Sequence, residues 1–155
     1  WDMLKDDIQD QEEEETLRIE QKIRKMTVGQ KIKLAYQGNI TVRRLLVRDA
    51  NKMVSSAVVK SGRMTETEIK SAAGNPNLDG DLLRKIARDK STMRKYPVKV
   101  ALANNPKCPV PIAVSILPHL SKGDLKNLSN SRQVPSVVFN AAKNLYRKKY
   151  QRGQG

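Results

Sequence analysis

Residues 101–112 read Ala-Leu-Ala-Asn-Asn-Pro-Lys-Cys-Pro-Val-Pro-Ile, and this stretch decides the fold class. The apolar opening suits the last turn of a helix, and the Asn105–Pro106 pair ends it. Pro111 stands where proline is tolerated, in the first turn of a new helix. The stretch therefore predicts a helix, an Asn-Pro turn and a second helix.

The same order of residues recurs elsewhere in the chain. Residues 72–83 carry Asn75–Pro76, 30 positions before Asn105–Pro106. Residues 128–138 form a degenerate third copy, about 25 positions further on, and residues 57–69 form a plausible earlier one. A single helix pair cannot bury its own apolar face, so recurrence at this period predicts stacked repeats. The irregular spacing predicts units of differing length.

Apolar residues at helical spacing predict further helices on both sides of these turns. Thr65, with Glu68 three positions later, has the spacing of a capping box. Pro97 should lie at the start of the helix within residues 92–103. The expected helical stretches are 17–26, 28–37, 41–48, 52–60, 65–73, 78–88, 92–103, 110–117, 124–128 and 135–150.

Composition agrees with an all-α core. The chain has one Phe, one Trp and four Tyr in 155 residues, so Leu, Ile, Val, Ala and Met must fill the interior. No stretch shows sustained alternation of apolar and polar residues, and we expect no sheet. No apolar run approaches the ~20 residues of a membrane helix. The acidic N-terminal residues lack the apolar segment of a signal peptide.

These motifs resemble those of the variant leucine-rich repeat and the wider HEAT-like α-solenoid group. Residues 26–150 are also similar to an uncharacterised HEAT-like bacterial domain known from deltaproteobacterial sequences. The resemblance implies a short, irregular α-solenoid of stacked helix pairs. The founding variant-repeat family carries an iron–sulfur cluster on a cysteine-rich segment. This chain has only Cys108, so that cofactor does not carry over, and we expect none.

Charge divides the chain into three segments. Residues 1–25 hold nine acids and five bases, and the remainder holds seven acids and 25 bases. We expect an acidic arm with a lead-in helix over 1–25, a repeat domain over 26–150 and a disordered tail over 151–155. The chain opens at Trp1 rather than Met, as a piece of a longer protein would. A single cysteine is compatible with a reducing cytoplasm, where we expect the protein.

Three clusters of basic residues stand apart from the leucine positions of their helices. On successive units of a solenoid, such clusters can merge into one stripe that follows a phosphate backbone. The predicted polyanion-binding residues are Arg43, Arg44 and Arg48; Arg84, Lys85, Arg88, Lys90, Arg94, Lys95 and Lys99; and Lys143, Arg147, Lys148, Lys149 and Arg152, with Tyr146 and Tyr150 interleaved.

Two functions remain open at this point. One is sequence-independent binding of DNA or RNA through phosphates, because no helix-turn-helix, zinc finger or base-stacking motif is legible. The other is a protein scaffold that grips an acidic partner, a common use of α-solenoids. Residues 1–25 could contact the basic face themselves and compete with the ligand.

Catalytic chemistry is not expected. His119 is the sole histidine, and neither Ser115 nor Ser121 lies in a nucleophile elbow. Cys108, between two prolines, reads as a buried filler. No phosphate-binding glycine loop or zinc-protease motif occurs. Bacterial alkylpurine DNA glycosylases with HEAT-like repeats use an aspartate beside aromatic residues in a basic groove, but the only tryptophan here is Trp1, outside the domain.

The acidic motifs also have structural explanations. Glu12–Glu15 lack the spacing of a calcium loop. Asp79 and Asp81 precede a helix, where carboxylates interact favourably with the helix dipole. We therefore expect no metal site.

Overall fold

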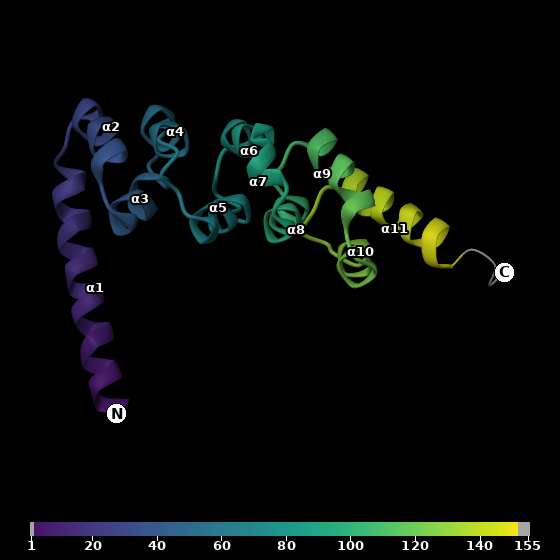
Figure 1. Ribbon diagram of the computed structural model, residues 1–155, viewed down its shortest axis with the longest axis horizontal. Coiled ribbons are helices and arrows are strands. Elements are labelled where there is room, and N and C mark those ends of the chain that lie inside the picture. The colour runs from purple at the N-terminus through teal and green to yellow at the C-terminus, as the bar shows by residue number, and fades with distance from the viewer. Residues whose placement is uncertain (1, 152–155) are drawn as a thin grey trace. The chain divides into compact units, whose positions relative to one another are not determined.

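The computed structural model describes residues 2–151, and this part of the chain is entirely helical (Figure 1). It contains eleven α-helices, one 3₁₀ turn and no strand. The all-α prediction is confirmed. Of the expected C-terminal tail 151–155, Gln151 is described and Arg152 to Gly155 lie outside the described residues, as does Trp1.

The chain divides into two compact units, Trp1–Met64 and Thr65–Gly155. The division differs from the expected boundary near residue 25, because contacts define the units whereas charge defined that boundary. The first unit contains α1 (Asp2–Arg24), α2 (Val28–Gln37), α3 (Ile40–Leu46) and α4 (Lys52–Lys60). The second contains α5 (Glu66–Ala73), α6 (Gly80–Arg88), α7 (Lys90–Met93), α8 (Tyr96–Asn104), α9 (Val110–Ile116), η1 (Leu117–His119), α10 (Lys122–Ser129) and α11 (Ser136–Tyr150).

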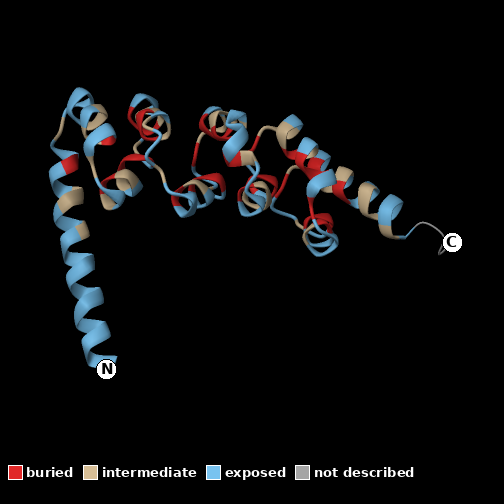
Figure 2. Cartoon of the chain, in the orientation of Figure 1, coloured by how far each residue is buried: buried red, intermediate tan, exposed pale blue. Residues whose placement is uncertain are grey.

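Helix α1 begins fifteen residues earlier than the short helix expected from Leu17 onwards. Only Ile23 is buried on it, so tertiary packing explains little of its length (Figure 2). Eight of its 23 residues are Glu or Gln, which form helices readily. Two pairs four residues apart, Glu14–Arg18 and Glu20–Arg24, add to its stability.

The first unit has a small core among α2, α3 and α4. Ala35, Leu46, Val54 and Val58 are fully buried there, and α2 contacts both other helices. Thr27 caps α2 in a capping box with Gln30. The expected bounds 28–37 and 52–60 are confirmed, because caps and glycines act locally.

The second unit is a succession of packed helices. Helix α8 contacts both α5 and α10. Three further contacts join helices that follow one another: α5 with α6, α8 with α9 and α10 with α11. Leu83, Leu102, Leu125 and Leu128 are fully buried between them. The expected capping box of Thr65 and Glu68 is present at the start of α5. Pro97 lies in the first turn of α8, as expected.

The two Asn-Pro turns make the same hydrogen bonds. In the first, the backbone N–H of Asn75 donates to Ala72 O, and Asn75 Oδ1 accepts from Asn77 N. In the second, the Asn105 amide donates to Leu102 O, and Asn105 Oδ1 accepts from Lys107 N. The residue three positions after each asparagine, Leu78 or Cys108, is buried.

The degenerate copy has the same turn with a serine in place of asparagine. Ser131 N donates to Leu128 O, and Ser131 Oγ accepts from Gln133 N. Val134, three positions later, is buried. These three turns join α5 to α6, α8 to α9 and α10 to α11. The copy over residues 57–69 instead joins α4 to α5, across the division between the units.

Candidate polyanion-binding surface

Net positive charge is concentrated in the second unit, because that unit has few acids. Residues 65–155 contain 17 lysines and arginines against six acids, whereas residues 1–64 contain 13 against ten. No aspartate or glutamate occurs after Asp124. Mutual repulsion among these excess positive charges favours association with a polyanion.

The first cluster lies on and just after α3, in the first unit. Arg44 and Arg48 are exposed. Arg43 is half-buried, and its Nη1 donates to Gly38 O at 3.0 Å, at the end of the preceding helix. Two of the three side chains in this cluster are therefore turned to solvent, and the third holds a helix end.

The second cluster lies on three consecutive elements, α6, α7 and the start of α8, which contact one another in that order. The side chains of Arg88, Lys90, Arg94 and Lys99 make no hydrogen bond or ion pair with any described residue. Lys85 has an interaction within the chain. The helices therefore bring four cations together without internal partners.

Two members of the second cluster are paired with carboxylates. Arg84 Nη1 lies 2.8 Å from Asp81 Oδ1, one turn away on α6. Lys95 Nζ lies 3.8 Å from Glu66 Oε2 of α5, at the side of a shallow groove of about 190 Å³. Both pairs are exposed, and such pairs contribute little to stability. A phosphate can therefore compete for either cation.

The third cluster lies on α11. Lys143, Arg147 and Lys148 are exposed. Lys149 Nζ donates to Pro118 O of η1 at 3.1 Å, so this side chain is engaged in packing α11. Helix α11 packs on α9, η1 and α10. The contacts that connect the second cluster to the third therefore run through α9 and α10.

One side of α11 carries aromatic residues as well as cations. Lys143 Nζ lies 5.6 Å from the ring centroid of Phe139, and the rings of Tyr146 and Tyr150 are 5.3 Å apart. Lys122 Nζ of α10 lies 5.4 Å from the ring centroid of Tyr150. Phe139 and Lys122 were not among the predicted residues. Phe139 could have been found from its helical spacing with residues 143, 146 and 150. Nothing in the sequence indicates that Lys122 contacts Tyr150.

The residues weighed for catalysis have other partners. His119 is exposed. Ser115 Oγ donates to Ile112 O, within its own helix. Ser121 caps α10, where its Oγ accepts from Asp124 N and donates to Asp124 Oδ2. No described histidine is within hydrogen-bond reach of either serine, so no nucleophile–base pair forms.

Cys108 is buried after the Asn105–Pro106 turn, as expected for a filler. Burial raises the pKa of its thiol to about 11, although a backbone hydrogen bond from Ala113 lowers it in part. The thiolate is the reactive form. At neutral pH this side chain therefore acts as an apolar group in the core.

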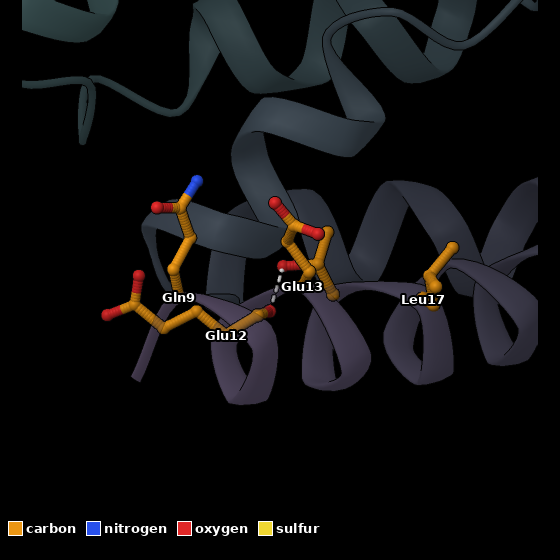
Figure 3. A pocket seen from close by; sticks show the side chains of 5 residues that line it. Gln9, Glu12, Glu13 and Leu17 are labelled. Carbon is orange, nitrogen blue, oxygen red and sulfur yellow. Dashed lines mark hydrogen bonds between the residues drawn. The ribbon is translucent and has the colours of Figure 1, made fainter. Parts of the chain in front are cut away.

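The acidic surface of α1 forms an open hollow and not an enclosed pocket. Gln9, Glu12, Glu13 and Leu17 line an open hollow together with Thr16, and all five come from one helix (Figure 3). Their side chains lack an opposing wall. Among residues 2–151, no group of three His, Cys, Asp or Glu is placed to hold a metal ion.

The comparisons place no relative beside this chain: no family model, curated protein or solved structure matches it. No helix within residues 2–151 has both the length and the apolar character that crossing a membrane requires.

Proposed function

We propose that this chain is a non-enzymatic binding module that holds nucleic acid through its phosphates, without base specificity. The observation that carries the proposal is the composition of residues 125–155, which contain seven lysines and arginines and no acid. On α11, Lys143, Arg147 and Lys148 project into solvent. With no carboxylate in this segment to neutralise them, an external anion is their natural counterion.

Cations without a partner in the protein gain the most binding free energy from contact with phosphates. A cation already paired must exchange one partner for another, whereas an unpaired one only releases condensed counterions from the nucleic acid. Eight predicted residues have side chains that make no hydrogen bond, ion pair or ring contact with any described residue: Arg44, Arg48, Arg88, Lys90, Arg94, Lys99, Arg147 and Lys148. Six of them belong to the second unit.

The second unit is, in this proposal, a short solenoid of the HEAT-like or variant leucine-rich type. The matching hydrogen bonds at Asn75, Asn105 and Ser131 support three successive helix pairs: α5–α6, α8–α9 and α10–α11. Equivalent surfaces of stacked pairs line up. Their cations would then form a track along which a phosphate backbone can lie.

An acidic protein is the second candidate partner. Val137, on α11, is 58% exposed. A large apolar side chain left open to solvent suits a protein partner better than a phosphate backbone. In this alternative the same cations bind carboxylates, and the unit acts as a scaffold.

Binding to a fluorescent duplex of about 20 base pairs, at about 50 and about 200 mM salt, tests the proposal. We expect a steep loss of affinity with salt and equal affinity for unrelated sequences, because phosphates carry no sequence information. Replacing Arg147 and Lys148 by Glu should weaken binding and lower the salt slope by about one for each residue.

The matched control replaces Lys33 and Lys60 by Glu. Both are exposed and lie outside the predicted clusters, so the net charge changes equally. If the control weakens binding as much as the α11 variant, general charge and not this surface binds the nucleic acid. If the protein binds neither duplex nor single strand at low salt, the scaffold function replaces the proposed one.

A further inference from the structure

The side of α11 that bears Phe139, Lys143, Tyr146 and Tyr150 is unusually rich in aromatic residues for this chain. These residues stand at spacings of four, three and four, so they share one side of an α-helix. The chain has six aromatic residues in 155, and half of them lie here. We call these four residues, with Lys122 of α10, the aromatic side of α11.

Contacts between neighbours hold these side chains in place. Lys143 lies over Phe139, and Tyr146 and Tyr150 form a tilted ring pair with an interplanar angle of 46°. Lys122 lies over the ring of Tyr150 from the neighbouring helix. The rings are therefore partly ordered before any ligand arrives, which reduces the entropy cost of binding.

The rings are nevertheless open to solvent in part. Phe139, Tyr146 and Tyr150 are all half-buried, and the last turns of α11 are exposed or intermediate (Figure 2). The buried side of α11 is carried by other residues, Val138 and Ala142. The aromatic residues thus extend past the core and are available to a partner.

Cations flank the rings, and α11 itself carries no carboxylate. Lys143 and Lys122 each lie against a ring, and Arg147 follows Tyr146 on the exposed surface. Rings beside cations in a segment free of acids match the two demands of an unpaired strand: stacking for bases and positive charge for phosphates.

We propose that the aromatic side of α11 binds unpaired nucleic acid, with bases stacked on Tyr146 and Tyr150 and phosphates held by Lys143 and Arg147. The inference rests on the proposed function and makes it more specific. In a duplex, bases are stacked on one another and cannot reach the rings, whereas phosphates are available in both forms. The tyrosines therefore contribute to single-strand binding alone.

The test measures binding of a fluorescent oligothymidylate of about 20 nucleotides and of a duplex of similar length, at about 100 mM salt. Tyr146→Ala with Tyr150→Ala should weaken single-strand binding by about tenfold or more, the loss expected from removing base stacking. Duplex binding should change by less than about twofold. Tyr146→Phe with Tyr150→Phe should retain single-strand binding, because phenylalanine keeps the ring.

Two controls separate stacking from structure. Tyr36→Ala removes an exposed tyrosine from the first unit, and its effect on either ligand should be negligible. Circular dichroism and the thermal midpoint of the double alanine variant report whether α11 still folds. If α11 unfolds, single variants at Tyr146 and Tyr150 replace the double one.

Each outcome has one meaning. Loss confined to the single strand, with rescue by phenylalanine, supports the inference. Unchanged single-strand binding, or equal losses on both ligands, overturns the inference and leaves phosphate binding in place. Failure of the unaltered chain to bind either ligand overturns the proposed function together with the inference.

Discussion

Asn105 shows how one side chain joins two turns that are far apart in the sequence. Its amide Nδ2 donates to Ala73 O at 2.7 Å and to Asn75 O at 3.0 Å, and the residue is 2% exposed. Its Oδ1 accepts from Lys107 N. All polar atoms of the side chain are thus satisfied in a buried position, where an unsatisfied one is costly.

Replacing Asn105 by Ala should destabilise the second unit by roughly 1–3 kcal/mol, because a buried carbonyl, a partly buried carbonyl and the backbone N–H of Lys107 lose a partner. Urea unfolding followed by circular dichroism measures the loss. Asn104→Ala is the matched control: that side chain is exposed and donates only to Val100 O within its own helix. Equal effects of the two substitutions would contradict the structural role of Asn105.

At the scale of elements, an ion pair holds helix α2 to the connection between α3 and α4. Lys31 Nζ lies 2.9 Å from Asp49 Oδ2, and both side chains are largely shielded, at 18% and 13% exposure. Burial opposes ionisation of Asp49. Hydrogen bonds from Lys31 and Asn51 N, with the charge of Lys31, outweigh it and lower the pKa of the carboxyl.

The lowered pKa predicts an acid-sensitive first unit. A carboxyl that ionises more readily when folded contributes stability above its unfolded pKa of about 4, and the contribution disappears as pH falls through the lower folded pKa. Asp49→Asn should therefore reduce the urea midpoint at about pH 7 but change it much less once the pH has fallen below the folded pKa of Asp49. Asp10→Asn, on the exposed part of α1, is the control and should leave the urea midpoint at about pH 7 unchanged. A constant difference between Asp49→Asn and the unaltered chain would contradict this account.

At the scale of the whole molecule, acids and bases are separated along the chain. Helix α1 carries nine acids and four bases, and the second unit carries the excess of cations. Glu12, Glu13 and Glu15 are exposed and make no ion pair with any described residue. We predict that this helix competes with a polyanion for the basic surface.

Replacing Glu12, Glu13 and Glu15 by Gln tests this competition. We expect duplex binding to tighten by about threefold or more at about 0.15 M salt. At this salt concentration, charges more than ~8 Å apart are largely screened from one another. Gln9→Glu with Gln11→Glu, on the same helix, should weaken binding instead. Unchanged affinity in both variants would reject the competition.

The sequence by itself determined most of the helices and their ends, because their signals are local. It did not predict α7 as a helix separate from α8. Thr27 and Thr65 cap the helices that follow them, and Pro97 opens α8 where expected. The Asn-Pro turns also followed from sequence, since each is made by hydrogen bonds within a few residues. The full length of α1 was missed because the apolar spacing used to find helices begins only at Leu17, whereas helix propensity sustains the acidic residues before it.

Only the tertiary structure decided which polar side chains are already occupied. Arg43, Lys95 and Lys149 look alike as surface cations in the sequence, yet each has an internal partner. Lys122 reaches Tyr150 across 28 positions, and Asn105 reaches Ala73 across 32. The physical reason is distance along the chain: caps and turns are made by neighbours, whereas these contacts exist only after separate helices have packed together.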